Sequence, residues 1–348
     1  MISDFNNATK PMSSSFTEIL AALLDRRELD EPMVRAAMAQ LLDANSGESE
    51  AAALLIAWRM KGETAEELAA AARVLREHMV PLETGRDDAV DTCGTGGDDA
   101  GSFNISTATA FVVAGAGASV VKHGNRAVSS SSGSADVLAE LGIKIQEGVA
   151  WPRRCLDRAG LAFCFAPYFH PVLRHVAPIR KRLGVRTIFN SLGPLANPAG
   201  AAFQLLGIGR RELLDPMAGA VAKLGVRRAV LVHGSDGLDE VSLSGTTEVR
   251  EIRDGEVIAR EWGALDFGLE PCSATELRVS GPAHSAAVIR KILAGVQGAP
   301  ARVVTANAAA ALWIAGRVDS LGAGVQLACQ AIHDGKAQAV LDALAKIS

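Results

Sequence analysis

Hydrophobic residues recur three and four positions apart through the first part of the chain, as they do along one face of a helix. This spacing predicts helices at residues 16–24, 32–42 and 51–60, and a fourth that begins after Thr64 and ends near Met79. The sequence Thr64-Ala65-Glu66-Glu67 matches a capping box, which satisfies the first backbone N–H groups of a helix. Because no strand-like run lies among these helices, we predict a flexible tail at residues 1–15 and a small helical domain at residues 16–84.

The pattern changes after Asp88, where short apolar runs alternate with helical segments, as in βαβ units with a parallel sheet. The predicted strands are residues 89–93, 118–122, 161–165, 203–208 and 228–233, and the predicted helices are residues 108–116, 149–159, 172–183 and 212–224. A hairpin is predicted at residues 247–252 and 256–260, and the chain beyond about Ser285 is predicted to be helical, with Asn307 beginning a helix at residues 308–314. We therefore predict an α/β fold with a helical N-terminal domain. Its α/β domain, residues 85–348, has a mainly parallel central sheet flanked by helices, some of which can return to the small domain.

Composition narrows the class of protein further. A chain of 348 residues, 49% of them hydrophobic, can bury a core without disulfides or metals. The net charge of -4 provides no general attraction to nucleic acid or to an anionic membrane. The five cysteines are scattered without metal-like spacing, and no signal peptide or membrane-spanning run is found. We therefore expect a cytoplasmic protein with reduced, mostly buried thiols and with neither nucleic acid nor membrane as a partner.

Glycine-rich and polar segments follow the predicted strands. The first strand ends in Gly94-Thr95-Gly96-Gly97-Asp98, a loop that can present bare backbone N–H groups to an anion. Asn104-Ile105-Ser106-Thr107 then precedes an apolar helix, and a helix N-terminus is a natural phosphate site. The second strand ends in Lys122-His123-Gly124-Asn125-Arg126, and the serine-rich residues 129–134 precede another helix.

Each of these segments alone is typical of an ordinary turn, and a lone His123 is more often structural than catalytic. Their common position carries more weight, because the carboxyl ends of parallel strands meet at one edge of an open α/β sheet, where ligands bind. The spacing matches neither the dinucleotide fingerprint nor the Walker phosphate loop. Together the segments predict a substrate that carries several phosphates.

Carboxylates gather after the strand at residues 228–233, where Asp236, Asp239 and Glu240 occur within five positions. Such oxygen ligands suit Mg²⁺ that is held partly through waters and substrate phosphates, although an acidic turn has the same composition. The segment at residues 186–198 is rich in Gly, Pro and Asn, and we predict a loop that is too long and too apolar to be a simple turn.

These motifs, in this order and over nearly the whole chain, closely resemble the anthranilate phosphoribosyltransferase family of tryptophan biosynthesis. The motifs that carry the resemblance are Gly94-Thr95-Gly96-Gly97-Asp98, Asn104-Ile105-Ser106-Thr107, Lys122-His123-Gly124-Asn125-Arg126, Gly133-Ser134-Ala135-Asp136, the segment at residues 186–198, and Asp236-Gly237-Leu238-Asp239-Glu240. The resemblance implies a homodimer whose subunits bind phosphoribosyl pyrophosphate and anthranilate between a small helical domain and a larger α/β domain. It also implies that two Mg²⁺ ions bind to each subunit.

The resemblance implies a role for individual residues as well. The residues expected on phosphoribosyl pyrophosphate are Gly94, Thr95, Gly96, Gly97, Asp98, Asn104, Ser106, Thr107, Lys122, Ser130, Ser131 and Ser132. The residues expected around anthranilate are Gly94, His123, Asn125, Arg180, Gly193 and Pro194, with Arg180 facing its carboxylate. Ser106 is implied as a contact of one Mg²⁺ ion and Asp239 with Glu240 as the ligands of a second, so that Lys122, Asp239 and Glu240 are the residues implied in catalysis.

Two departures from the family pattern and two alternatives accompany this interpretation. Asp99 stands where the family often has glycine, and Cys93 where it often has an aliphatic residue. A pyrimidine-nucleoside phosphorylase shares the fold and glycine loop, but it needs no metal for a diphosphate, so the Asp239-Glu240 pair counts against it. A catalytically silent nucleic-acid-binding relative would have lost part of the phosphate or metal set and gained a basic face. Association with the glutamine amidotransferase of the same pathway is left open by the sequence.

Overall fold

The computed structural model describes residues 14–98, 100–126 and 132–347. It begins with a bundle of four helices, α1 (Phe16–Leu24), α2 (Glu31–Leu42), α3 (Glu48–Lys61) and α4 (Ala65–Glu77). The capping box predicted at Thr64 is present, because the Thr64 side chain accepts from Glu67 N–H and the Glu67 carboxylate accepts from Thr64 N–H. The predicted helical N-terminal region is therefore confirmed.

A sheet of seven strands follows, in the order β3-β2-β1-β4-β5-β6-β7. The strands are β1 (Val90–Gly94), β2 (Val120–Gly124), β3 (Leu161–Phe165), β4 (Phe203–Gly207), β5 (Arg228–Gly234), β6 (Thr247–Arg253) and β7 (Glu256–Trp262). The first five are parallel, whereas β6 runs antiparallel to β5 and to β7. Asp254 and Gly255 both have positive φ in the turn between β6 and β7, as the predicted two-residue hairpin requires. The mainly parallel sheet is confirmed.

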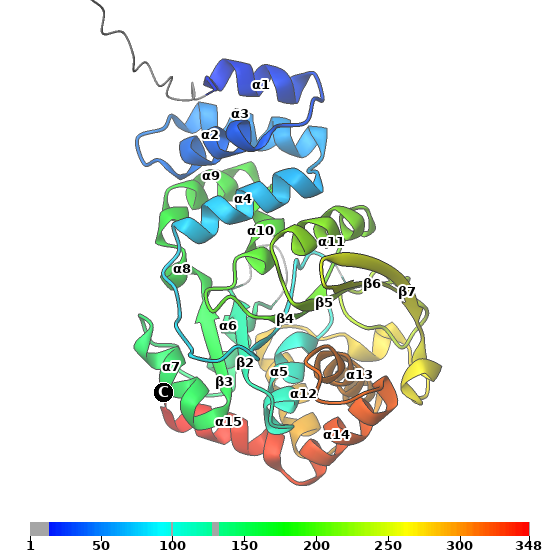
Figure 1. Ribbon diagram of the computed structural model, residues 1–348. Helices are drawn as coiled ribbons and strands as arrows, with labels where there is room; N and C mark the ends of the chain where they lie inside the picture. Colours follow the sequence, from blue (N-terminus) through cyan, green and yellow to red (C-terminus); the bar gives the residue numbers. More distant parts are fainter. Residues whose placement is uncertain (1–13, 99, 127–131, 348) are drawn as a thin grey trace, which may run out of the picture.

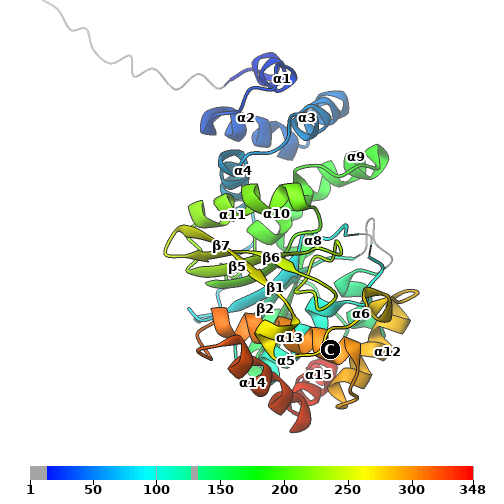
Figure 2. The ribbon, with the colours of Figure 1, turned by 90° about the vertical axis from the view of Figure 1, so that its right-hand side faces the viewer.

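Helices cover both faces of this sheet, so that the molecule is built in layers (Figures 1 and 2). The helices that lie between the strands in sequence are α5 (Ile105–Gly115), α6 (Ser134–Glu140), α7 (Ala150–Ala159), α8 (Ala166–Phe169), α9 (Val176–Leu183), α10 (Phe189–Leu195) and α11 (Leu214–Lys223). Four more follow the hairpin, α12 (Pro282–Leu293), α13 (Ala299–Ile314), α14 (Leu321–His333) and α15 (Lys336–Ile347). Short 3₁₀ turns occur at Pro171–Arg174, Arg211–Leu213, Ala264–Phe267 and Ala274–Leu277.

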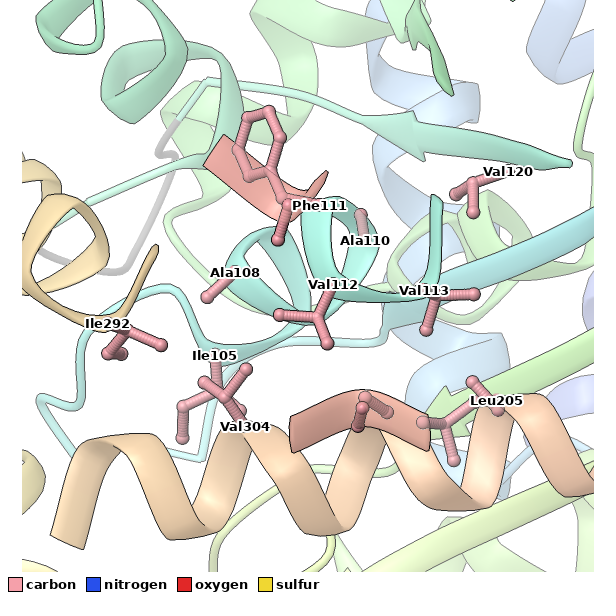
Figure 3. Close-up of a cluster of buried hydrophobic side chains, with 14 of the residues drawn as sticks. Ile105, Ala108, Ala110, Phe111, Val112, Val113, Val120, Leu205, Ile292 and Val304 are labelled. Atoms are coloured by element: carbon pink, nitrogen blue, oxygen red, sulfur yellow. The ribbon is translucent and has the colours of Figure 1, made fainter. Parts of the chain in front are cut away.

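Helices α10 and α11 cover one face of the sheet, and the helical bundle packs on their outer side through α4, with α9 beside α3. Helix α5 with α12 to α15 covers the other face (Figure 1). Successive strand residues point to opposite faces, so Leu205 joins the core on the α5 side while Leu206 joins the core on the α11 side. Figure 3 shows the α5 side, where Val112 points from α5 toward α13, which carries Val304, while Phe111 points away from α13 on the opposite side of α5. The sheet is thus held rigidly between two apolar layers, which fixes the loops at its carboxyl edge.

Three predicted elements were wrong in detail. The predicted helix at residues 172–183 is a 3₁₀ turn followed by α9, and the predicted loop at residues 186–198 contains the helix α10. That helix was hidden because Gly193 and Pro194, which usually end helices, lie inside it. Asn307 does not begin a helix but lies in the middle of α13, among small apolar residues that give no start signal.

The cysteines and the helix lengths agree with an ordinary globular fold. All five cysteines are free, with Cys93, Cys155 and Cys164 buried, Cys272 partly buried and Cys329 exposed. Across the three ranges that the structure describes, each helix is too short or too polar to cross a bilayer.

Candidate active site

A cleft of about 530 Å³ opens at the carboxyl edge of the parallel strands. Strands β1, β2 and β3 follow one another toward one edge of the sheet, whereas β4 lies on the other side of β1. The strand order therefore reverses between β1 and β4, which is the position where open α/β sheets bind ligands. Leu75 of α4 contributes to the wall, which brings the helical bundle to the cleft. The residues predicted for the site that line this cleft are Gly94, Thr95, Gly96, Gly97, Asp98, Asn104, Ser106, Lys122, His123, Asn125, Ser132, Arg180, Gly193, Pro194, Asp239 and Glu240.

Three residues predicted for the site are not placed in the cleft. Thr107 is buried on α5 and lines a separate small cavity beside Trp151 and Lys122. The predicted contact between Thr107 and phosphoribosyl pyrophosphate therefore finds no support in its position. Ser130 and Ser131, like the unusual Asp99, lie outside the described residues.

The glycine loop at residues 94–98 is held by partners from the end of β4 and from the loop after β5. Thr95 donates its N–H to the Gly207 carbonyl over 2.8 Å, and its hydroxyl accepts from Gly209 N–H over 3.0 Å. Gly96 donates its N–H to the Asp239 carboxylate over 3.0 Å. This approach requires a glycine in β4, because a Cβ on Gly207 would lie 1.7 Å from the Asp239 carbonyl oxygen. The loop is thus fixed with Asp239 packed against it.

Lys122 connects β2 with β1 and α5 beneath the cleft. Its ammonium group donates to the Thr92 carbonyl and, over 3.0 Å, to the Ser106 hydroxyl in the first turn of α5. The side chain is only 3% exposed, and burial lowers the pKa of Lys122 although the carboxylates of Asp91, Glu240 and Asp239 oppose this. A buried cation therefore faces the phosphate-binding side of the cleft.

Asp239 and Glu240 enter the cleft from the loop after β5. Burial raises the pKa of Asp239 well above its usual range, and the neighbouring charges of Asp98 and Glu240 raise it further. Burial also raises the pKa of Glu240, with Asp98 adding to the effect and Lys122 opposing it. Within residues 14–98, 100–126 and 132–347, no three His, Cys, Asp or Glu side chains gather closely enough to hold a metal by themselves. A cation bound here would need waters or substrate oxygens to complete its shell, as Mg²⁺ usually does.

Asn104 lies at the start of α5 and is held by two serine hydroxyls. Its side-chain oxygen accepts from Ser132 over 2.8 Å and from Ser285 of α12 over 3.0 Å, while its N–H donates to the Ser285 hydroxyl over 2.9 Å. Ser285 is fully buried. These bonds place the amide of Asn104 and the N-terminus of α5 at the cleft, where the positive end of the helix dipole suits a phosphate.

The opposite side of the cleft is an aromatic slot. His123 of β2 bonds through Nδ1 to the Gly193 carbonyl over 2.9 Å, and its ring centre lies 5.0 Å from that of His170. Burial lowers the pKa of His123 to about 3, with His170 adding to the effect, and burial lowers the pKa of His170 to about 4. Both imidazoles are therefore neutral at pH 7, which suits an uncharged ring beside them.

Two arginines stand at the end of this slot. Arg180 of α9 lies over the Phe189 ring and donates to the Asn190 side-chain oxygen over 3.4 Å. Burial lowers the pKa of Arg180, and the charge of Arg186 lowers it further. Arg186 donates to the Thr95 carbonyl over 3.1 Å, so it joins this slot to the glycine loop. Two neighbouring guanidinium groups favour an anionic ligand such as a carboxylate.

Four residues that this geometry brings into or beside the site were not predicted from the sequence. His170 and Arg186 line the cleft, and Asn190 and Ser285 orient Arg180 and Asn104. His170 could have been found, since it follows the strand at residues 161–165 as the other cleft residues follow theirs. Ser285 gave no signal, because a serine at a helix start is usually a simple cap.

Comparison with known sequences assigns both parts of the chain to one group. The sequence model described as "Glycosyl transferase family, a/b domain" matches residues 86–338. A second, described as "Glycosyl transferase family, helical bundle domain", matches residues 17–79.

Individual relatives are similar to this chain over nearly its whole length. The anthranilate phosphoribosyltransferase of Anaeromyxobacter sp. (strain Fw109-5) is 45% identical over 330 residues, which cover 95% of this chain and 97% of the relative. Among solved structures, the anthranilate phosphoribosyltransferase of Thermus thermophilus is similar with a TM-score of 0.87 and 39% identity over 94% of this chain and 98% of that one. The Saccharomyces cerevisiae enzyme in complex with PRPP and Mg is similar with a TM-score of 0.85 and 26% identity over 95% of this chain and 97% of that one. Similarity of this extent, in sequence and in fold, shows that the chain belongs to the anthranilate phosphoribosyltransferase family.

Proposed function

We propose that this chain transfers the phosphoribosyl group of phosphoribosyl pyrophosphate to the amine of anthranilate and releases pyrophosphate, a step of L-tryptophan biosynthesis. The observation that carries the proposal is the division of one cleft into two halves. One half has the glycine loop, Lys122 and two buried carboxylates, and the other has Arg180 beside two neutral imidazoles. The yeast relative has been solved in complex with PRPP and Mg and in complex with 4-fluoroanthranilate, which supports the same pair of ligands here.

On the phosphate side, the chain supplies donors that are already oriented. N–H groups of the glycine loop and the side chains of Asn104, Ser106 and Ser132 would bind the diphosphate and the 5′-phosphate. As the bond between C1′ and the diphosphate oxygen breaks, negative charge grows on the leaving group. Lys122 would stabilise this charge from a buried position where its effect is little screened.

The pair Asp239 and Glu240 fits a divalent cation. Burial and the charge of Asp98 raise the pKa of both carboxylates, so the pair forms a site that a positive ion would stabilise. We propose two Mg²⁺ ions per subunit, one contacting Ser106 and one held by Asp239 and Glu240. When bound, Mg²⁺ would supply positive charge to the pyrophosphate as it departs.

On the aromatic side, Arg180 would bind the anthranilate carboxylate, and His123, Asn125, Gly193 and Pro194 would enclose the ring. The anthranilate amine is neutral at pH 7, so it can attack C1′ and form the new C–N bond without a strong general base. Holding the amine in line with the breaking bond is then the main contribution of this half of the cleft. The two-domain subunit and the homodimer expected from the family resemblance, and the cytoplasmic location expected from the composition, remain predictions.

Anthranilate fluorescence tests the proposal directly. Mixing the protein with anthranilate, phosphoribosyl pyrophosphate and Mg²⁺ should abolish the fluorescence, and the double variant Asp239→Ala, Glu240→Ala should not. Turnover by both proteins would refute the metal role of the carboxylates. No turnover by either, together with phosphate-dependent cleavage of a pyrimidine nucleoside, would favour the phosphorylase.

A further inference from the structure

The amide of Asn307 is buried in the middle of α13. Figure 2 shows that this long helix lies beneath the sheet. Its side chain is fully buried, and its neighbours along the helix include Val303, Val304, Ala306 and Ala308. Burying an amide among apolar groups is costly unless its polar atoms find partners. The position of Asn307 therefore has to be explained by what its side chain binds.

Asn307 binds both backbone polar groups of one residue in another segment. Its side-chain oxygen accepts from Val241 N–H over 2.9 Å, and its NH₂ group donates to the Val241 carbonyl over 3.1 Å. The second hydrogen of that NH₂ group goes to the Val303 carbonyl, one turn back in α13, over 2.9 Å. The amide is thus used as a two-point clamp, 66 residues away in sequence from the backbone that it holds.

Val241 follows Glu240 directly, so the clamp holds the peptide that carries a carboxylate of the cleft. Residues of the same loop hold the adjoining backbone. Asp236 accepts from Leu238 N–H over 3.2 Å and from the Ser242 hydroxyl over 2.8 Å, and Thr247 accepts from Ser242 N–H over 2.9 Å. Asn307 differs from these in that it ties the loop to a helix packed against the far side of the sheet (Figure 1).

A fixed backbone matters at this point because like charges face one another there. Asp98, Asp239 and Glu240 all line the same cleft, and like charges repel one another, so without restraint the carboxylates would tend to separate. A cation that bridges protein and diphosphate needs its oxygen ligands at a set distance. Residues that form hydrogen bonds to the ligands or to their backbone hold the ligands at that distance.

We infer that Asn307 is a positioning residue for the divalent-cation site, holding Glu240 in place through the backbone of Val241. This inference rests on the proposed function, in which Asp239 and Glu240 bind Mg²⁺. Asn307 itself does not line the cleft, so it acts only through the loop.

The test distinguishes the loss of the two hydrogen bonds to Val241 from a general disturbance of helix α13. Asn307→Ser removes both bonds to Val241, while a serine hydroxyl can still bond to the carbonyl one turn back, as Thr305 does with Ala301 over 2.8 Å. Thr305→Val is the matched control, because it removes a buried hydroxyl from the same helix whose hydrogen bond to Ala301 stays within α13. Mn²⁺ binding to the whole protein, with and without inorganic pyrophosphate, is followed by electron paramagnetic resonance.

We expect Asn307→Ser to weaken Mn²⁺ binding in the presence of pyrophosphate about tenfold, the usual effect of losing a group behind a metal ligand. Thr305→Val should leave Mn²⁺ affinity unchanged. Because Asn307 acts through Glu240, adding Asn307→Ser to Glu240→Ala should weaken binding no further than Glu240→Ala alone. The KM for anthranilate should change less than twofold in Asn307→Ser.

Other outcomes would overturn either the positioning role of Asn307 or the ligand role of Glu240 on which it rests. If Glu240→Ala binds Mn²⁺ as the native protein does, the proposed ligand role fails and the inference falls with it. If Glu240→Ala weakens binding but Asn307→Ser does not, the inference alone is overturned. Asn307→Thr provides a second variant that fills more of the space. If neither substitution at Asn307 yields folded protein while Thr305→Val does, Asn307 is a structural residue of α13 and the positioning role is refuted.

Discussion

The carboxylate of Asp239 accepts a 3.0 Å hydrogen bond from the N–H of Gly96, which joins two loops 143 residues apart in the chain. One loop is predicted to bind a diphosphate and the other a cation, so the contact brings the two functions together. Asp239 thereby holds an N–H group of the loop that would otherwise be free to bind phosphate. The site is connected before any ligand enters it.

Replacing Asp239 with Asn keeps the shape of the side chain but removes its charge. We expect kcat to fall by about 10²–10³-fold, the range found when one group that stabilises transition-state charge is removed. The midpoint of thermal unfolding should stay the same or rise, because one of three facing carboxylates, with Asp98 and Glu240, is neutralised. Steady-state kinetics and calorimetry measure the two effects, and a fall in kcat of less than tenfold would contradict the assignment.

Gly207→Ala should damage the site although Gly207 does not line the cleft. The new Cβ would lie 1.7 Å from the Asp239 carbonyl oxygen, so the loop after β5 must move. We expect the free energy of unfolding to fall by about 1–3 kcal/mol, as in other overpacked sites, and activity to be largely lost.

Gly322→Ala is the control for this variant. A Cβ on Gly322 of α14 would meet no atom within 4 Å, so the substitution should stabilise the helix by about 0.5–1 kcal/mol and leave activity unchanged. Denaturant unfolding and turnover assays measure both proteins. Full activity in Gly207→Ala would show that the position of this loop is not critical.

Arg180→Ala should impair anthranilate binding more than binding of phosphoribosyl pyrophosphate. Hydrogen bonds to a charged group are worth about 1.5–3 kcal/mol, which corresponds to a KM for anthranilate raised roughly 10- to 150-fold. Arg182→Ala on the same helix is the control, because its side chain is 63% exposed and paired with Glu48 at the surface. Equal losses for both substrates in Arg180→Ala would argue against the assignment.

His170 should make stability depend on pH. Burial lowers its pKa from 6.5 to about 4, so the unfolded chain takes up a proton more readily than the folded protein. The stability that this provides is complete above pH 6.5 and is lost as the pH falls towards 4, by about 3 kcal/mol in all. His170→Gln should therefore show a smaller loss of stability between pH 6.5 and 4 than the native protein in urea unfolding.

The exposed His175 serves as the comparison, since His175→Gln also removes one imidazole from this segment. An identical pH dependence in His170→Gln and in the native protein would mean that His170 binds a proton equally in both states.

Most of the sheet and the bundle could be predicted from the sequence because each strand or helix has its own local signal. Residues 161–165 form an apolar run, and their strand was predicted to the residue, while the hairpin is marked by Asp254-Gly255. The split at His175 and the helix α10 could not be predicted, because they are set by packing against α3 and α4 rather than by spacing. Tertiary contacts override local propensity there.

The candidate site was predictable where its residues follow strands in clusters. Lys122, His123 and Asn125 lie in one motif, and Asp239 and Glu240 in another. Residues that position the site without lining the cleft had no such signal in the sequence. Asn307 is one polar residue among alanines, and only the fold shows that its amide meets Val241. Such pairs join distant parts of the chain, and a single sequence does not reveal which distant parts meet.

The antiparallel pairing of β6 with β5 has a consequence for the way in which ligands are received. Gly234 and Thr247 are paired across the sheet, so the segment that carries Asp239 and Glu240 is closed at both ends. The loops after β1, β2 and β3 each lead into a helix instead. A segment tied at both ends has little conformational entropy left to lose on binding. The carboxylates are thus preorganised, and any adjustment to an arriving substrate must come from the other rim of the cleft.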